Sequence, residues 1–202
     1  MTWTGIVAES FDIPAFREYV EDLSWNEGWK PSFITLHNTA APSLAQRPNG
    51  FTRQHMFNLE KYYRDQKGWP SGPHLFIDDH KIWVFNPLTK PGTHSPSWNR
   101  TAIGIEMLGD YATESFVKGR GADVRVNSVH ALGFLSLKLG FKHDAWRFHK
   151  QDPKTTHDCP GINVRNVRKA LEQEVAAVMG AKPVVAYTPS GEPFWPLAKK
   201  KV

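Results

Sequence analysis

The sequence lacks several features that mark common classes of protein. Its 202 residues include a single cysteine, so no internal disulfide can form and folding does not depend on oxidation. No run of about 18 apolar residues is present, which argues against a membrane-spanning helix. The first twelve residues have neither a cationic start nor a continuous apolar stretch. We therefore expect no signal peptide and synthesis in the cytoplasm.

Other absences limit the choice of partner. The formal net charge of +5 favours polyanions such as nucleic acid, anionic membrane or bacterial cell-wall polymer. No Lys/Arg block is interleaved with aromatic residues, so we expect no nucleic-acid binding. No His-Glu-x-x-His pair is present, which argues against one large class of zinc peptidases. Nothing in the sequence requires a dimer, and we expect a monomer.

The residues that are present predict an α/β protein. Short apolar runs bounded by turn residues predict strands at 32–37, 74–79, 81–85, 102–108 and 145–149. Helical spacing predicts helices at 13–23, 53–66, 124–139 and 164–179, with Thr52 as an N-cap and glycines 140 and 180 as terminators. This alternation predicts a central mixed β-sheet flanked by helices on both faces. The composition changes after Gly180, so we expect a domain over 1–180 and a Pro-rich basic tail over 181–202.

Three residues carry donor atoms suited to a zinc ion. His37 and His149 each end a predicted strand, and Cys159 follows ten residues after His149 in a loop long enough to fold back. Ligands often converge at the ends of neighbouring strands, and a catalytic zinc takes three such donors and keeps one position for water. Singly, a cysteine is more often a small buried hydrophobe and a histidine a hydrogen-bonded polar group. Together with the flanking motifs described below, the three favour a metal site.

One carboxylate stands inside an apolar run. Glu106 occupies the segment AIGIEML, between Ile105 and Met107. It either points inward with a partner or lies on the solvent face of an edge strand. The apolar run favours the inward, paired carboxylate, because an unpaired charge is costly to bury.

Five segments resemble the signature blocks of a known family. In order they are ITLHNTA, GPHLFIDDHKIWVF, PGTHSPSWNRTAIGIE, IGIEMLGDY and HKQDPKTTHDCPG. They are similar to the blocks of the zinc-dependent N-acetylmuramoyl-L-alanine amidases, a family that includes phage endolysins, cell-wall recycling enzymes and peptidoglycan recognition proteins. The resemblance implies the peptidoglycan recognition protein-like amidase fold. It also implies hydrolysis of the amide between the lactyl group of N-acetylmuramic acid and L-alanine in peptidoglycan.

The resemblance also implies roles for single residues. His37, His149 and Cys159 match the family's Zn²⁺ ligands, and Glu106 matches a glutamate that orients or deprotonates the attacking water. His157 stands where many members have a lysine that stabilises the developing oxyanion, unless the neighbouring Thr156 is the true equivalent.

A second set of residues is expected to bind substrate. His94 matches a histidine that lines the family's substrate cleft, and Trp98 and Asn99 follow it in a loop where they can contact sugar or peptide. His74, in the hairpin block, is expected to act with them. Many phage members have a tyrosine at the position of Pro73, so Glu106 is expected to carry more of the base function here.

The resemblance leaves the biological role open. A phage or prophage endolysin, acting on the cell wall after release from the cytoplasm, is favoured by the basic charge and the size. A cytosolic recycling amidase acting on soluble muropeptides is the first alternative. A peptidoglycan-binding module without catalysis is the second, and the presence of both Cys159 and Glu106 argues against it.

Overall fold

The computed structural model describes residues 2–25 and 28–180, so the predicted tail at 181–202 lies outside the described residues. One six-stranded sheet organises the domain, with strand order β1-β4-β3-β5-β2-β6. The strands are β1 (Glu9–Phe11), β2 (Phe33–Asn38), β3 (Leu75–Ile77), β4 (Ile82–Val84), β5 (Ala102–Met107) and β6 (Trp146–Phe148). Strands β3, β5, β2 and β6 run parallel, whereas β4 is antiparallel to both β3 and β1. The predicted mixed sheet is confirmed.

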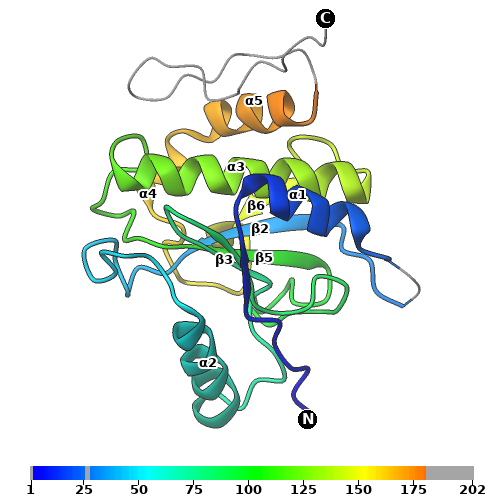
Figure 1. Ribbon diagram of the computed structural model, residues 1–202. Coiled ribbons are helices and arrows are strands. Elements are labelled where there is room, and N and C mark those ends of the chain that lie inside the picture. The colour runs from blue at the N-terminus through cyan, green and yellow to red at the C-terminus, as the bar shows by residue number, and fades with distance from the viewer. Residues whose placement is uncertain (1, 26–27, 181–202) are drawn as a thin grey trace, which may run out of the picture.

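Helices lie on both sides of this sheet. They are α1 (Ile13–Asp22), α2 (Arg53–Lys61), α3 (Arg120–Leu139), α4 (Ile162–Arg165) and α5 (Arg168–Val178). Helices α1, α3 and α5 lie on one side of the sheet, and α2 lies on the other (Figure 1). A π-helical turn, η1 (Tyr62–Gln66), continues α2, and a 3-10 turn, η2 (His149–Gln151), follows β6. No helix among the described residues is both long and apolar enough to cross a membrane.

The two faces of the sheet differ in chemistry because successive side chains of a strand alternate between them. Leu36 pairs in register with Ile105 on one side and with Phe148 on the other, and all three are buried apolar residues. On the opposite face, Glu106 pairs with His37 in β2 and with Phe76 in β3. The register therefore places the polar side chains of His37 and Glu106 next to each other on one face of the sheet.

Local signals fix several helix ends, and the sequence predicts those set by Thr52 and Gly140. Thr52 caps α2 by accepting a hydrogen bond from the backbone N–H of His55 at 3.3 Å. Asp12 caps α1 in the same way through Ala15, at 3.0 Å. Gly140 ends α3 with φ at 70°, a left-handed conformation that glycine adopts without steric cost.

Some boundaries differ from the sequence prediction. Strand β1 was not predicted, helix α3 begins at Arg120 rather than at 124, and the last predicted helix is divided into α4 and α5. Residues 62–66 form a π-helical turn instead of continuing the α-helix. These elements depend on contacts with distant parts of the chain, which local periodicity does not contain.

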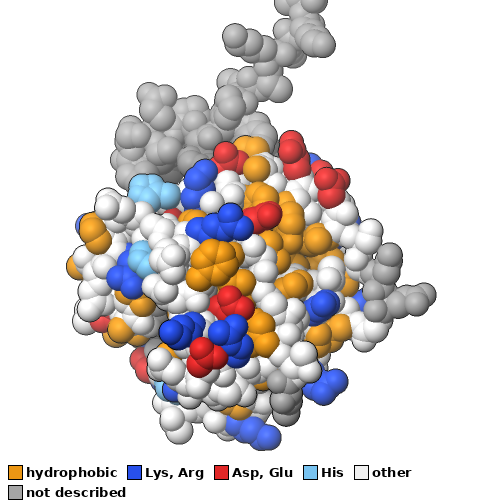
Figure 2. Space-filling model, turned by 60° about the horizontal axis from the view of Figure 1, so that its bottom comes forward, with side chains coloured by type: hydrophobic (Ala, Val, Ile, Leu, Met, Phe, Trp, Pro, Cys, Tyr) orange, Lys and Arg blue, Asp and Glu red, His pale blue; other side chains and the backbone are white. Residues whose placement is uncertain are grey.

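Surface charge is mixed on the side of the molecule shown in Figure 2. Basic, acidic and hydrophobic side chains lie close together there. A continuous basic stripe of the kind that follows a nucleic-acid backbone is not visible on this face.

Candidate metal centre

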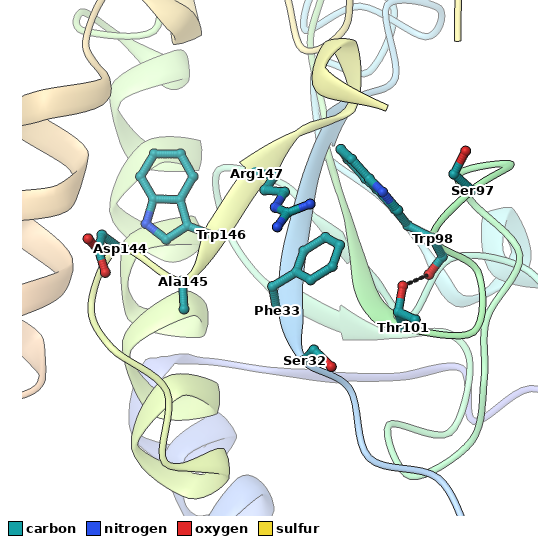
Figure 3. Close-up of a pocket in the computed structure, with 9 residues that line it drawn as sticks. All are labelled: Ser32, Phe33, Ser97, Trp98, Thr101, Asp144, Ala145, Trp146 and Arg147. Atoms are coloured by element: carbon teal, nitrogen blue, oxygen red, sulfur yellow. Dashed lines mark hydrogen bonds between the residues drawn. The ribbon is translucent and has the colours of Figure 1, made fainter. Parts of the chain in front are cut away.

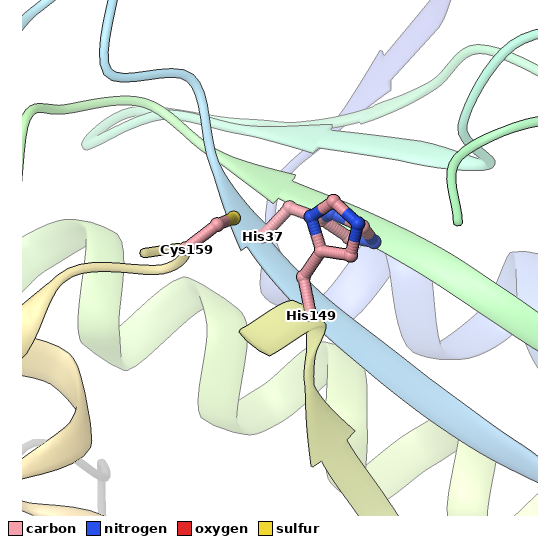
Figure 4. Close-up of side chains that lie close together, drawn as sticks. All are labelled: His37, His149 and Cys159. Atoms are coloured by element: carbon pink, nitrogen blue, oxygen red, sulfur yellow. The ribbon is translucent and has the colours of Figure 1, made fainter. Parts of the chain in front are cut away.

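The three predicted metal ligands come together at one edge of the sheet. His37 lies near the end of β2, His149 begins η2 directly after β6, and Cys159 lies in the loop before α4. Because β2 and β6 are parallel neighbours, their carboxyl ends lie side by side. One ligand atom from each of the three residues lies within 4.8 Å of the other two. Figure 4 shows the Cys159 sulfur pointing toward the two imidazole rings.

A chain of hydrogen bonds fixes which nitrogen of His37 is free. The backbone carbonyl of Ala102 can only accept, so the Nε2 of His94, at 3.1 Å, is the donor. Burial lowers the pKa of His94 to about 3, so this ring is neutral and its Nδ1 is an acceptor. That Nδ1 lies 3.1 Å from the Nε2 of His37, which therefore donates to it. The lone pair on the Nδ1 of His37 is left for a ligand.

The close approach of His94 to the sheet requires a glycine in β5. A Cβ atom built on Gly104 would lie 2.4 Å from the His94 ring. No side chain fits in that space without displacing the ring. The motif AIGIEML thus supplies both the buried carboxylate and the gap that the supporting histidine fills.

The other two candidate ligands are also chemically suited to a metal. The Nε2 of His149 is buried and has no hydrogen-bond partner among the described residues. The Sγ of Cys159 accepts a 3.4 Å hydrogen bond from the backbone N–H of Asn38. Burial lowers the pKa values of His37 and His149 and raises the pKa of the Cys159 thiol. Neutral imidazoles have free lone pairs, and a bound cation favours the thiolate, so this donor set fits zinc.

Glu106 lies beside this group. Strand β5 is flanked by β3 and β2, so Glu106 is not on an edge strand, and its side chain is only 15% exposed. Its Oε1 lies 3.9 Å from the Nδ1 of His37, the atom with the free lone pair. Burial raises the pKa of the Glu106 carboxyl to about 8. A divalent cation beside it would lower this value and favour the carboxylate.

His157 lies at the outer side of the cluster. Its side chain is exposed, and its ring stacks on that of His149 with centroids 5.8 Å apart and an interplanar angle of 18°. This contact places His157 next to one of the three candidate metal ligands. Whether it or Thr156 acts on substrate stays a prediction.

Two of the predicted substrate contacts need correction. His74 is fully buried, and its ring accepts a hydrogen bond from the Gly104 N–H at 2.9 Å and donates to the Lys90 carbonyl at 2.9 Å. His94 is 8% exposed and has both ring nitrogens committed, as described above. Neither ring is free to bind a substrate. Both histidines support the site through hydrogen bonds, His94 to the candidate ligand His37 and His74 to the backbone of β5.

Asn99 and Trp98 occupy the loop that follows His94. The side-chain oxygen of Asn99 accepts hydrogen bonds from the backbone N–H groups of His94 and Ser95, both at 2.7 Å. This arrangement fixes the start of the loop. Trp98 packs edge-on against Phe33, with ring centroids 5.2 Å apart, and lines a pocket.

Tyr63 is a residue near the site that sequence reasoning did not select. It lies on the π-helical turn η1, and its ring stacks on Trp69 at 5.1 Å and 9°. A Cβ on Gly72 would lie 3.0 Å from this ring. Burial and the charge of Glu106 raise the pKa of the Tyr63 hydroxyl. The feature that points to Tyr63 is its place on a π-helical turn, because such turns often occur at functional sites.

Comparison with known proteins identifies the family. The family model described as N-acetylmuramoyl-L-alanine amidase matches residues 27–162, more than half of the chain. Peptidoglycan-recognition protein SC2 of Drosophila melanogaster is 24% identical over 137 residues, which cover 67% of this chain and 71% of that protein. This chain belongs to the N-acetylmuramoyl-L-alanine amidase family.

Solved structures agree with this assignment. The N-acetylmuramoyl-L-alanine amidase LysC from Clostridium intestinale URNW superposes with a TM-score of 0.54 and 25% identity, covering 74% of this chain and 89% of that one. A variant of Drosophila PGRP-LB in complex with tracheal cytotoxin superposes with a TM-score of 0.56 and 18% identity, covering 70% and 83%. The predicted peptidoglycan recognition protein-like amidase fold is confirmed.

Proposed function

We propose that this protein is a zinc-dependent N-acetylmuramoyl-L-alanine amidase. It cleaves the amide between the lactyl group of N-acetylmuramic acid and L-alanine, and His37, His149 and Cys159 are its zinc ligands. The observation that carries this proposal is the cluster of one donor atom each from His37, His149 and Cys159 within 4.8 Å of one another. The Nε2 of His149 is also buried and has no hydrogen-bond partner in the part of the chain that the structure describes. An unpaired buried nitrogen is costly unless a ligand satisfies it.

Zinc in this position would polarise the amide carbonyl and make water acidic enough to act near neutral pH. The chain's own residues supply the proton transfers. Glu106 accepts a proton from the attacking water as the new carbon–oxygen bond forms. It then gives that proton to the leaving nitrogen as the carbon–nitrogen bond breaks, which releases the lactyl carboxylic acid and the amine of L-alanine. His157 donates a hydrogen bond to the developing oxyanion.

The relatives support the substrate class. The family is that of N-acetylmuramoyl-L-alanine amidases, and LysC is named as one. A structural relative of PGRP type was solved with tracheal cytotoxin bound. Peptidoglycan or soluble muropeptides are therefore the substrates to test first.

The decisive experiment is digestion of purified sacculi, with mass spectrometry of the products. We expect free stem peptides that begin with L-alanine, lost on chelation and restored by zinc. Products cut inside the stem peptide would contradict the proposed bond. Intact sacculi in the presence of bound zinc would favour a peptidoglycan-binding module instead.

The biological setting is a second part of the proposal. We propose an endolysin of a phage or prophage that reaches the cell wall after release from the cytoplasm. The basic composition supports it, because the bacterial envelope is anionic. A higher rate on intact sacculi than on soluble muropeptides is the expected result. The reverse preference would indicate a cell-wall recycling amidase.

A further inference from the structure

The pocket that Arg147 lines lies away from the candidate metal centre. The guanidinium carbon of Arg147 is 4.3 Å from the centroid of the Phe33 ring and 5.4 Å from that of Trp98 (Figure 3). Phe33 begins β2, whereas His37 lies near the end of that strand. The pocket therefore does not adjoin the metal ligands. Groups that can hold those ligands in place lie instead in the segment 150–165.

Two of the three candidate ligands are joined through their neighbours in the sequence. Lys150 follows His149 in η2, and Asp158 precedes Cys159. The backbone N–H of Lys150 donates a 2.8 Å hydrogen bond to the carbonyl of Cys159. Its ammonium group forms an ion pair with the carboxylate of Asp158. Lys150 thus holds the Cys159 loop against the turn that carries His149, through both its main chain and its side chain.

A second cation contacts Asp158 from helix α4. The Nη2 of Arg165 lies 3.1 Å from the Asp158 carboxylate, and its Nη1 donates to the Asp158 carbonyl at 3.3 Å. Arg165 is the last residue of α4, and the N–H of Gly161, at the start of that helix, donates to the same carbonyl at 2.9 Å. The Asp158 network (Lys150, Asp158 and Arg165) therefore ties the Cys159 loop to the turn before it and to the helix after it.

This network lies mostly at the surface. The side chains of Lys150 and Asp158 are 51% and 56% exposed, and that of Arg165 is 19% exposed. Exposed ion pairs contribute little to the overall stability of a protein. They matter more where a loop must be ordered to bind a ligand, because contacts that order it beforehand reduce the entropy lost on binding. The Cys159 loop is such a segment, since it carries one of the candidate ligands.

We propose that Asp158 is a positioning residue that orders the Cys159 loop before zinc binds, and so raises the affinity of the site for zinc. The inference rests on the zinc site of the proposed function. Asp158 does not belong to the group of donor atoms found among the described residues. It acts through Cys159, because a loop that moves away leaves only His37 and His149, and a zinc site needs at least three protein ligands.

A direct effect of charge would have a different sign from a positioning effect. Lys150 and Arg165 each repel a nearby cation, so removing either positive charge would tighten zinc binding if charge alone mattered. If the two residues anchor Asp158, removing either one loosens the Cys159 loop and weakens zinc binding. The two cationic residues therefore decide between the explanations, whereas both explanations predict weaker binding when Asp158 is neutralised.

Competition with a coloured chelator measures the zinc affinity of the full-length variants. We expect Lys150→Gln, Arg165→Gln and Asp158→Asn each to weaken zinc binding about three-fold. Lys150→Arg should restore it, because arginine keeps the charge and the donor groups. Lys154→Gln is the matched control. It removes a positive charge from the same loop, where the Lys154 side chain forms no ion pair or hydrogen bond with any described residue, and it should bind zinc at least as tightly as the wild type.

A double variant tests whether the residues act as one unit. Asp158→Asn and Arg165→Gln break the same contact, so the two together should weaken zinc binding no more than Asp158→Asn alone. Independent effects would multiply to about nine-fold and would contradict a shared network. Circular dichroism of the metal-free variants checks that each one is folded. If Arg165→Gln unfolds, Lys150→Gln alone decides, because its side chain is half exposed.

Zinc affinity does not depend on hydrolysis, so this test is separate from that of the amidase proposal. Unchanged or tighter zinc binding in Lys150→Gln and Arg165→Gln would overturn the positioning role, as would a wild-type protein that binds no zinc. Weaker binding in both variants of a protein that leaves sacculi intact would support the positioning role and contradict the amidase function. Digested sacculi with equal zinc affinity in every variant would have the opposite meaning.

Discussion

His37 has one ring nitrogen committed to His94 and the other directed toward Glu106. The Ala102 carbonyl accepts a hydrogen bond from the Nε2 of the neutral His94 ring, which leaves the His94 Nδ1 to accept one from His37. Supporting hydrogen bonds of this kind orient a metal ligand and raise its basicity. The affinity of the site thus depends on a residue that does not itself reach the metal position.

Replacing this supporting ring should weaken metal binding. His94→Phe keeps an aromatic ring above Gly104 but removes both hydrogen bonds. We expect zinc affinity to fall about 10–100-fold, measured by competition with a coloured chelator. His143→Gln, at an exposed position outside the cluster, is the control and should bind zinc as the wild type does. Unchanged affinity in His94→Phe would show that His37 needs no such support.

Glu106 is predicted to act on protons rather than to hold the metal. Glu106→Gln preserves the shape of the side chain and removes its capacity to accept a proton. Hydrolysis should fall about 10²–10⁴-fold, while zinc content by elemental analysis stays at the wild-type level. Cys159→Ser should instead lose zinc as well as activity. Loss of zinc in Glu106→Gln would reassign the carboxylate as a ligand.

At the scale of elements, one carboxylate ties the loop after His94 to the turn that carries His149. Asp152 follows η2, and its Oδ2 accepts hydrogen bonds from the Ser95 hydroxyl at 2.5 Å and from the Ser97 N–H at 2.9 Å. Burial alone raises the pKa of Asp152, but these hydrogen bonds outweigh it and bring the value to about 2. The ionised form is therefore the one that the fold stabilises.

This tether should give a measurable acid dependence of stability. The pKa of Asp152 in the folded protein lies below the ordinary value of 3.8, so its contribution is complete above about pH 4 and disappears as the pH falls toward 2. Asp152→Asn should lower the free energy of unfolding by about 1–3 kcal/mol at neutral pH. Urea unfolding of both proteins between pH 6 and pH 2 should show the difference shrinking on acidification. A difference that is constant with pH would contradict the assignment.

The elements show what local sequence can predict. Thr52 and Gly140 set helix ends through contacts within a few residues, so pattern alone located them. Strand β1 has three residues and exists because Glu9 pairs with Val84, far along the chain. Gly121 lies in the first turn of α3, although glycine disfavours helices, because any side chain there would meet the Ser115 carbonyl.

In the candidate site too, some features could be predicted from the sequence and others depend on contacts between distant residues. The grouping of the three candidate ligands was predictable because strand ends converge, the loop after His149 is long enough to return, and the flanking segments resemble the signature blocks of the family. The burial of His74 and His94 was not predictable, since spacing along the chain does not state which atoms a ring will contact. Arg147 gave no signal either, because a charge on an edge strand ordinarily faces solvent. Its stacking on Phe33 and Trp98 could not be predicted, because both rings are distant from it in sequence.

At the scale of the whole molecule, the candidate ligands join two parts of the chain that are more than 100 residues apart, because His37 is far in sequence from His149 and Cys159. His37 belongs to β2, His149 to the turn after β6, and Cys159 to the loop before α4. A bound ion would connect β2 to the end of the edge strand β6 and to the loop before α4. A ligand that binds only the folded protein stabilises it in proportion to the logarithm of its free concentration over Kd.

Zinc should therefore raise the melting temperature. At a free zinc concentration of 100 times Kd, the stabilisation is about 2.7 kcal/mol. For a domain of this size, each kcal/mol moves Tm by about 2–4 °C, so chelation should lower Tm by about 5–10 °C. Scanning calorimetry with and without chelator measures this shift, and Cys159→Ser should lose most of it.

Calcium or magnesium at the same concentration should leave Tm unchanged, because both prefer oxygen donors and this site offers two nitrogens and a sulfur. An equal shift with those ions would mean that the cation acts elsewhere on the protein.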